Sequence, residues 1–213
     1  MNNIAIFDLD GTLLNSIGDL VLAANNTREK FGLPPLPQET IKSFVGDGVV
    51  KFVERLFNSQ QIEEELKTFK EEYILHIADT TKPYEGIMEV ILNIKSRNFV
   101  VGILSNKSSN LTNLVLEMLN IYFFFDFVYG GDNFPEKKPS PIPILKILEE
   151  FDGNRGTSFM IGDSCNDILA GKNAGVKTIG VTYGFSPRNY INECKPDFVA
   201  NTPLEIEKYI ISD

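Results

Sequence analysis

Short apolar runs bounded by polar or turn-forming residues recur along the chain, and each has the length of a buried strand. Residues 4–9 are apolar as far as Asp8 and are followed by Asp10-Gly11, and residues 99–104 read FVVGIL. Continuous apolar runs of this length are typical of strands buried on both faces of a parallel sheet. The pattern predicts strands over residues 4–9, 99–104, 127–129, 158–161, 178–181 and 198–200.

Between these strands, apolar residues recur with helical spacing. In residues 87–95, the side chains of Ile87, Val90, Ile91 and Ile94 fall on one face of a helix. Buried strands that alternate with amphipathic helices are typical of an α/β fold with a Rossmann-like parallel sheet, in which ligands bind at the carboxyl ends of the strands. The other helices predicted by this spacing cover residues 111–119, 142–150, 167–174 and 204–211.

One long segment interrupts the alternation directly after the first strand. From residue 17 to residue 83 the pattern predicts helices and no convincing strand, and the run GLPPLP at 32–37 marks a turn. We therefore predict an α/β core domain of residues 1–16 and 84–213, and a helical cap domain of residues 17–83 above the carboxyl end of the first strand. The helices expected in the cap cover residues 19–31, 38–44, 49–57 and 62–78.

Charge and composition narrow the classes of function. The 213 residues carry a formal net charge of −9, which argues against a nucleic-acid partner because such proteins need a basic surface. No apolar run approaches the roughly 20 residues of a membrane-spanning helix, and the first residues lack the basic segment of a signal peptide. We therefore expect a cytoplasmic protein without a membrane partner, as a monomer or a homodimer.

The cysteine content predicts no special chemistry. Cys165 and Cys194 are far apart in the sequence and lack the spacing of a metal site. We expect both to be reduced thiols.

The pentapeptide Asp8-Leu9-Asp10-Gly11-Thr12 contains the first candidate site. Its two carboxylates, at positions i and i+2 of an extended segment, point to the same side. Like charges so close together repel one another unless a cation or a proton lies between them, and Mg²⁺ prefers hard oxygen ligands. The pattern favours a magnesium site, although an acidic turn after a strand would use the same residues.

Two further segments offer groups that can bind phosphate. Ser105 and Asn106 end the second strand and can donate hydrogen bonds to phosphate oxygens, although both also suit the N-cap of a helix. Pro139 favours an extended conformation at Lys138, so that the lysine ammonium would be held in place opposite a phosphate. A solvated loop before a helix would explain Lys138 equally well.

A second acidic pair follows the apolar residues 159–161. Asp163 closes this strand and Asp167 lies one helical turn further, so that both carboxylates can face one point. A turn followed by a helix cap also fits these residue types. Nevertheless, a second acidic pair at the same edge of the sheet is less expected by chance, and it favours a shared metal site.

Taken together, the four segments resemble the four motifs of the haloacid-dehalogenase-like hydrolase superfamily, in the same order and each at the end of a predicted strand. The resemblance covers the whole chain, because the helical insert is similar to the small cap of that superfamily. Several shorter segments resemble its phosphoglycolate phosphatase-like branch. These are residues 45–48 (VGDG), 138–141 (KPSP), 162–164 (GDS), 182–184 (TYG) and 195–197 (KPD).

The resemblance implies a magnesium-dependent phosphatase that forms an aspartyl-phosphate. It makes Asp8 the nucleophile and Asp10 the acid that protonates the leaving alkoxide and then helps to activate water. Dehalogenases of the superfamily lack this second Asp, so dehalogenation is disfavoured. The remaining implied roles are Lys138 as the catalytic counter-charge, Thr12, Ser105 and Asn106 as substrate-binding residues, Asp8, Asp163 and Asp167 as carboxylate ligands of the metal, and Asp10 as a ligand through its backbone carbonyl.

The resemblance also implies a small phosphorylated metabolite, first of all 2-phosphoglycolate, as substrate. Lys51 and Arg55 lie four residues apart on a predicted cap helix. Together with the N-terminus of that helix, the two cations could bind the carboxylate of the substrate. A solvated helix face would use the same two cations. The alternative functions are a pyrophosphatase or sugar phosphatase of the same fold and a phosphomutase of the β-phosphoglucomutase type. A non-catalytic binding protein is disfavoured because every motif residue is present.

Overall fold

The apolar strands assemble into one parallel sheet in the computed structural model, which describes residues 1–212. Within that range the sheet has six strands in the order β5-β4-β1-β6-β7-β8. The first strand lies in the middle and pairs in parallel with both β4 and β6, so the carboxyl ends of these three strands meet at one edge. The predicted Rossmann-like α/β fold is confirmed. The strands are β1 (Asn3–Phe7), β4 (Phe99–Leu104), β5 (Phe127–Tyr129), β6 (Phe159–Gly162), β7 (Lys177–Val181) and β8 (Phe198–Ala200).

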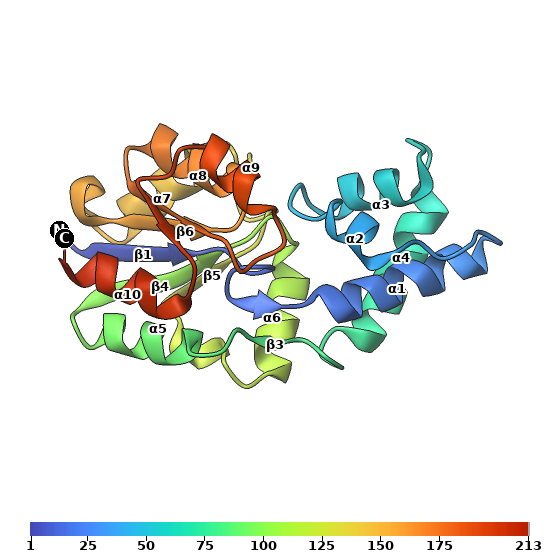
Figure 1. Cartoon of the computed structure of the whole chain (residues 1–213), viewed down its shortest axis with the longest axis horizontal. Coiled ribbons are helices and arrows are strands. Elements are labelled where there is room, and N and C mark those ends of the chain that lie inside the picture. Colours follow the sequence, from blue (N-terminus) through green and yellow to red (C-terminus); the bar gives the residue numbers. More distant parts are fainter. Residues whose placement is uncertain (213) are drawn as a thin grey trace.

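Residues of β1 alternate between the two faces of the sheet, as expected of a strand. Ala5 and Phe7 belong to the hydrophobic cluster that includes α5 and α10, whereas Ile4 and Ile6 belong to a second cluster with α7 and α8. Helices therefore cover both faces, and the sheet is buried between them (Figure 1). These helices are α5 (Ile87–Lys95), α7 (Ile142–Glu150), α8 (Cys165–Ala174) and α10 (Pro203–Ser212).

Some short elements of the core differ from the sequence-based expectation. The helix α9 (Arg188–Glu193) was not predicted, because six residues are too few to show a helical period. Helix α6 (Ser109–Met118) and α8 both begin two residues before the predicted start, where Ser108 and Ser164 are the N-cap residues. Two 3₁₀ turns, Tyr122–Phe124 and Arg155–Thr157, complete the core.

A layer of helices forms a second unit beside the carboxyl edge of the sheet (Figure 1). Two chain segments connect it to the core, and they pair as the short antiparallel strands β2 (Leu14–Asn15) and β3 (Lys82–Pro83). The expectation that residues 17–83 contain no strand is wrong at its last two residues, because a two-residue strand has no periodic pattern. The helices of this unit are α1 (Ile17–Lys30), α2 (Gln38–Lys42), α3 (Val49–Phe57) and α4 (Glu63–His76).

A buried carboxylate fixes the two connecting segments to each other. Asp19, near the start of α1, is fully buried and accepts hydrogen bonds from the backbone N–H groups and the hydroxyl groups of Thr80 and Thr81. Four donors satisfy the carboxylate, as burial of a charge requires. The connection between cap and core is therefore anchored beside the ribbon of β2 and β3.

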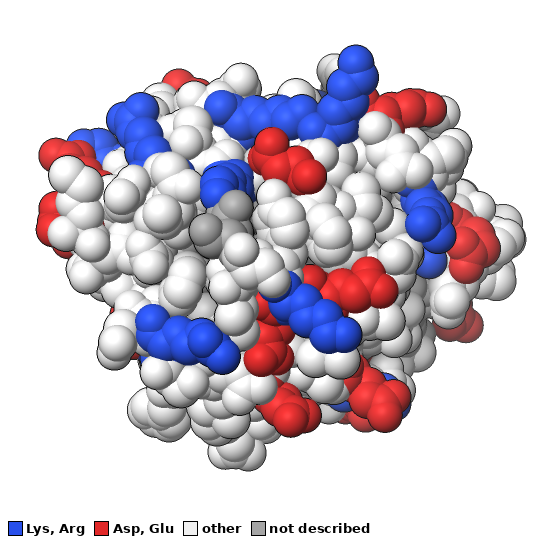
Figure 2. All heavy atoms as spheres, turned by 60° about the vertical axis from the view of Figure 1, so that its left-hand side comes forward, with Lys and Arg blue, Asp and Glu red and all other residues white. Residues whose placement is uncertain are grey.

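Charged side chains of both signs are mixed on the surface. Figure 2 shows Lys and Arg interspersed with Asp and Glu over the face at the end of the core where the termini lie, without a continuous basic area on that face. Among residues 1–212, no helix combines the length and the apolar character needed to span a membrane.

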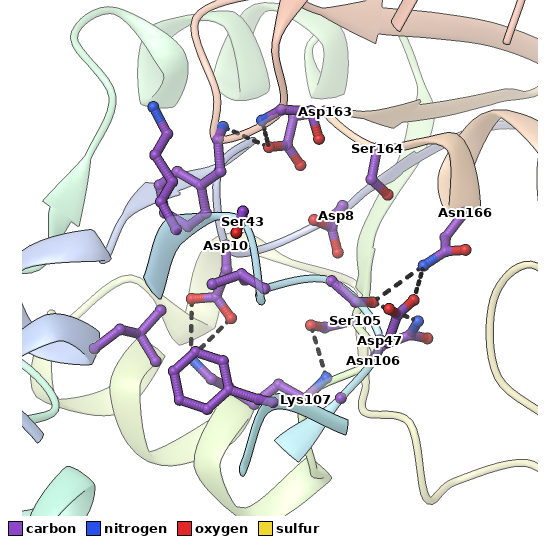
Figure 3. A pocket seen from close by; sticks show the side chains of 18 of the residues that line it. Asp8, Asp10, Ser43, Asp47, Ser105, Asn106, Lys107, Asp163, Ser164 and Asn166 are labelled. Atoms are coloured by element: carbon purple, nitrogen blue, oxygen red, sulfur yellow. Dashed lines mark hydrogen bonds and ion pairs between the residues drawn. The ribbon is translucent and has the colours of Figure 1, made fainter. Parts of the chain in front are cut away.

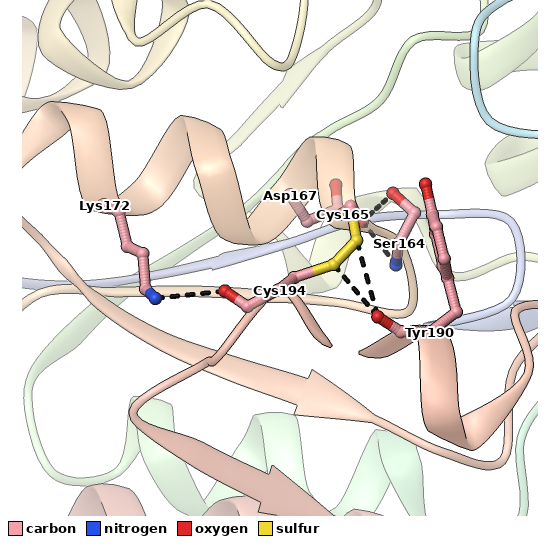
Figure 4. The surroundings of a disulfide bond; sticks show 6 residues. All are labelled: Ser164, Cys165, Asp167, Lys172, Tyr190 and Cys194. Atoms are coloured by element: carbon pink, nitrogen blue, oxygen red, sulfur yellow. Dashed lines mark hydrogen bonds between the residues drawn. A yellow bond between two sulfur atoms is a disulfide. The ribbon is translucent and has the colours of Figure 1, made fainter. Parts of the chain in front are cut away.

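The structure contradicts the expectation of two free thiols. Cys165, the first residue of α8, and Cys194, just after α9, form a disulfide, with their Cα atoms 5.6 Å apart (Figure 4). The expectation failed because sequence separation does not limit contact across neighbouring strands. Lys172, later in α8, donates a hydrogen bond to the Cys194 carbonyl at 3.0 Å and adds to this link. The disulfide thus joins α9 to the end of α8 that carries Asp167.

Candidate active site

Loops that follow β1, β4 and β6 converge on a pocket of about 520 Å³ between the core and the cap (Figure 3). Core residues form its floor, including Asp8, Ser105, Lys138 and Asp163, and residues of the cap helices close it from the other side. The parallel order of the strands explains the convergence, since their carboxyl ends meet at one edge.

Three carboxylates meet in the floor of the pocket. Oxygen atoms of Asp8, Asp163 and Asp167 all lie within 4.8 Å of one another, and the three residues are almost completely buried. The Lys138 Nζ atom lies 2.7 Å from both the Asp8 and the Asp167 carboxylates and also donates to the Leu104 carbonyl at 2.5 Å. Three carboxyl groups thus share a single ammonium in this cluster.

The electrostatics of this cluster favour an added cation. Burial, together with repulsion from Asp167, raises the pKa of Asp8 from 3.8 to about 7, although Lys138 works in the opposite direction. Burial and the charges of Asp8 and Asp167 raise the pKa of Asp163 well above its ordinary value. Burial disfavours the charged form of Lys138, but Asp167 and Asp8 more than compensate, so that its pKa is raised. The donor set is hard oxygen in a buried, negatively charged site, which fits Mg²⁺.

Backbone groups hold Asp163 in position. Its Oδ2 atom accepts hydrogen bonds from the N–H groups of Phe185, at 2.6 Å, and Ser186, at 3.3 Å. Gly11 and Gly184 pack against the same carboxylate so closely that a Cβ atom on either would overlap it, and Gly11 also has a φ of +88°. Residues 185 and 186 follow all four motifs, and no pattern in the sequence signals their contribution.

Asp167 is held by both of its oxygens. Its Oδ2 accepts hydrogen bonds from the Ser164 N–H at 3.0 Å and hydroxyl at 2.6 Å, in a capping box at the start of α8. Its Oδ1 pairs with Lys138. The helix-cap explanation of Asp167 is therefore confirmed. Its Oδ1 also lies beside Lys138 in the carboxylate cluster, and its role as a metal ligand stays a prediction.

Asp10 lies apart from the carboxylate cluster. Its carboxylate is 2.9 Å from Lys107 Nζ, and Ser16 donates a hydrogen bond to its Oδ1 at 2.5 Å. It lines the pocket beside Asp8 (Figure 3). The side chain is therefore placed for a role other than side-chain coordination, and the metal contact through the Asp10 carbonyl stays a prediction.

The predicted phosphate-binding residues are placed differently from one another. Ser105 is buried in the pocket lining, and its Oγ accepts a hydrogen bond from the Lys107 N–H at 3.2 Å. The Asn106 amide donates to the carbonyls of Gly46 and Lys138, both at 2.9 Å, and so ties the cap to the core. Thr12 is completely buried beneath the site and is not among the described residues that line the pocket.

The structure separates the two predicted cap cations. Lys51 is exposed, forms an ion pair with Glu54 at 2.7 Å and is not among the described pocket residues. Arg55 does line the pocket, but it forms an ion pair with Asp47. The same Asp47 accepts a hydrogen bond from the Asn166 amide at 2.8 Å, so Arg55 belongs to a contact between cap and core.

A family model described as haloacid dehalogenase-like hydrolase matches residues 5–181. This range contains all the pocket carboxylates and the whole cap. The chain belongs to the haloacid dehalogenase-like hydrolase family. The resemblance inferred from the four motifs is therefore confirmed, and the fold places those motifs around one pocket, as the family membership requires.

Relatives of this haloacid dehalogenase-like hydrolase match it over nearly its whole length. A phosphoglycolate phosphatase of Aquifex aeolicus is 35% identical over 205 residues, covering 96% of this chain and 95% of the relative. One of Chromobacterium violaceum is 38% identical over 208 residues, covering 94% and 92%. A crystal structure described as a predicted phosphoglycolate phosphatase from Haemophilus somnus superposes with a TM-score of 0.90 at 27% identity, covering 98% and 97%. The prediction of a phosphatase-type hydrolase is confirmed.

Proposed function

We propose that this hydrolase is a magnesium-dependent phosphatase that removes phosphate from 2-phosphoglycolate through an aspartyl-phosphate on Asp8. The observation that carries the proposal is the arrangement of Asp8, whose carboxylate contacts Lys138 at 2.7 Å and lies near those of Asp163 and Asp167 in the pocket between core and cap. The names of relatives that match more than nine-tenths of the chain support the substrate.

The charges of the site suit nucleophilic attack on phosphorus. Asp8 must be ionised to attack, and Lys138 favours that form by direct contact. Asp8 and Asp163 would hold Mg²⁺, with Asp167 as a further ligand or as a partner that orients the other ligands. When bound, the ion supplies positive charge for the phosphoryl oxygens. Phosphoryl transfer depends mainly on positioning and charge neutralisation, and the chain provides both with its own lysine and loops.

Asp10 is the proton donor and acceptor of the proposed reaction. Its carboxyl lines the same pocket as Asp8 but is outside the group of three carboxylates. It would protonate the leaving glycolate oxygen as the bond to phosphorus breaks, and then take a proton from the water that attacks the aspartyl-phosphate. The two acids of the first motif thus have separate tasks because their side chains have separate partners.

The best candidate to contact the substrate carboxylate is a cap lysine outside the predicted pair of Lys51 and Arg55. Lys42, at the end of α2, lines the pocket, and its ammonium has no ion pair or hydrogen bond with any residue in 1–212. The other pocket cations, Arg55, Lys107 and Lys138, are each neutralised by an aspartate. An unpaired ammonium opposite the phosphoryl site would attract a substrate that carries a carboxylate.

We further propose that residues 17–83 act as a cap that closes over the substrate about the ribbon of β2 and β3. Contacts of Asn106 and Asn166 with residues 46 and 47 support a closed arrangement, which would keep bulk water from the reacting phosphoryl group. We place the enzyme in the cytoplasm, where small phosphorylated metabolites are made, as a monomer or a homodimer.

The decisive experiment measures phosphate release from 2-phosphoglycolate, pyrophosphate, sugar phosphates and 4-nitrophenyl phosphate, with Mg²⁺ and with EDTA. We expect 2-phosphoglycolate to have the highest kcat/KM, and Asp8→Asn and EDTA each to abolish turnover. If another substrate leads while both requirements hold, the mechanism stands and the substrate is wrong. Conversion of β-glucose 1-phosphate to its isomer would instead identify a phosphomutase, and full activity of Asp8→Asn would refute the proposal.

A further inference from the structure

Lys107 is a buried cation in the active site to which the motif comparison gave no role. It follows Ser105 and Asn106 in the loop after β4, and only 9% of its side chain is exposed. Its Nζ atom lies 2.9 Å from the Asp10 carboxylate and donates a hydrogen bond to the Tyr73 hydroxyl at 2.7 Å. Figure 3 shows Lys107 and Asp10 joined in the lower part of the pocket.

The three partners come from three separate parts of the fold. Asp10 lies in the loop after β1, Lys107 in the loop after β4, and Tyr73 on the cap helix α4. The Tyr73 ring is buried, with the Lys107 Nζ atom 4.8 Å from its centroid, and it stacks on Phe69. The link from Asp10 through Lys107 to Tyr73 therefore crosses the boundary between core and cap.

A buried ion pair of this kind restricts the orientation of the carboxylate. Burial disfavours the charged form of Lys107, but Asp10 and Tyr73 hold the pKa of its ammonium above the ordinary value. Removing one partner of such a pair leaves an uncompensated charge. Ser16 holds the same carboxylate through its Oδ1 atom, so Asp10 is supported by two donors from within the core and by none of the metal-cluster residues.

We propose that Lys107 positions the carboxyl group of Asp10 for proton transfer to the leaving oxygen, and that Tyr73 completes this support only when the cap lies over the site. Lys107 is thus a positioning residue, and it acts through Asp10. The inference rests on the proposed function, because it takes Asp10 as the acid. In this arrangement Asp10 is correctly oriented to donate its proton only after the cap has closed over the substrate.

Leaving groups that differ in their need for a proton test the inference. Glycolate leaves as an alkoxide and needs protonation, whereas 4-nitrophenolate leaves readily without it. Release of the leaving group in a single turnover isolates this step, because the later hydrolysis of the aspartyl-phosphate is common to both substrates. For Lys107→Met we expect the rate of glycolate release from 2-phosphoglycolate to fall at least about tenfold, a fraction of the full effect of a general acid, while the rate of 4-nitrophenol release from 4-nitrophenyl phosphate changes less than about threefold. Tyr73→Phe and Ser16→Ala should also lose more activity with 2-phosphoglycolate than with 4-nitrophenyl phosphate, and we call this difference the bias. Their losses should be smaller than that of Lys107→Met.

Two comparison variants make the outcome unambiguous. Asp10→Asn sets the bias expected when the acid itself is lost, and Lys146→Met removes an exposed ion pair with Glu149 on α7, so it should leave both activities unchanged. If Asp10→Asn is biased and Lys107→Met loses both activities equally, the positioning role is refuted and the proposed function stands. If Asp10→Asn shows no bias, the acid role of Asp10 falls, and this inference falls with it.

Tyr73→Phe keeps the aromatic ring and its stacking, so it provides the test if Lys107→Met does not fold. If that variant does not lose more activity with 2-phosphoglycolate than with 4-nitrophenyl phosphate, the link to cap closure is wrong. A circular dichroism spectrum and an unfolding midpoint for each variant separate a folding defect from a change in chemistry.

Discussion

The raised pKa of Asp8 predicts that removing the nucleophile stabilises the metal-free protein. Asp8 is buried beside Asp163 and Asp167, and burial is the main reason why its pKa rises from 3.8 to about 7. At neutral pH and above, the folded chain must therefore ionise a carboxyl group in a site that disfavours the charge. Asp8→Asn keeps the size and shape of the side chain but never carries that charge.

The pH dependence has a definite sign. Between pH 4 and 7 the folded state retains a proton on Asp8 that the unfolded state has released, so this residue lowers stability as the pH rises. The rise in pKa from 3.8 to about 7 corresponds to roughly 4 kcal/mol, at about 1.4 kcal/mol for each tenfold change in proton affinity. We expect metal-free Asp8→Asn to be more stable than wild type by on the order of 4 kcal/mol at pH 8 and by almost nothing at pH 4.

Urea unfolding in EDTA, followed by far-UV circular dichroism at pH 4, 6 and 8, measures this difference. Urea is suited to the purpose because it does not screen charges as a salt would. Asp152→Asn serves as the control, since Asp152 forms only an exposed pair with the N-terminus and its loss should change stability by less than about 1 kcal/mol. Added Mg²⁺ should narrow the gap by stabilising wild type. If Asp8→Asn is less stable than wild type at pH 8, or if the gap does not shrink toward pH 4, the electrostatic account is refuted.

Three other perturbations have defined outcomes. Lys138→Met leaves the buried carboxylates of Asp8 and Asp167 without their cation. It should reduce kcat at least about a thousandfold and destabilise the metal-free protein by roughly 3 to 5 kcal/mol. A variant as stable as wild type in EDTA would contradict this expectation. Lys42→Met should raise KM for 2-phosphoglycolate about tenfold. It should change KM for 2-hydroxyethyl phosphate, which has a hydroxymethyl group in place of the carboxylate, by less than about twofold; the same selective loss in Lys51→Met instead would move the carboxylate site to α3. Reduction of the disulfide between Cys165 and Cys194, 29 residues apart, should lower the free energy of unfolding by roughly 3 to 4 kcal/mol, and two titratable thiols in the unfolded protein before reduction would show that the bond is absent.

Local sequence pattern was sufficient for most of the core. The strand of residues 99–104 and the helices of residues 87–95 and 142–150 have the predicted bounds. The prediction succeeded because a buried strand and a helix buried on one face each require a characteristic spacing of apolar residues. The short elements β2, β3 and α9 were missed, because none of them shows a bounded apolar run or a visible period. The convergence of Asp8, Asp163 and Lys138 was also predictable, since parallel strands bring their carboxyl ends to one edge.

The sequence by itself determined the α/β core, the position of the insert, the family motifs and the set of acidic residues at the edge of the sheet. Tertiary structure decided how those residues are paired. It placed Lys107 against Asp10 and Tyr73, which are 97 and 34 residues away from it along the chain, and brought Cys165 next to Cys194. It also placed Lys42, and not Lys51, in the lining of the pocket. Such pairings depend on how the cap lies on the core, and the spacing of residues within one element carries no information about the distance to another.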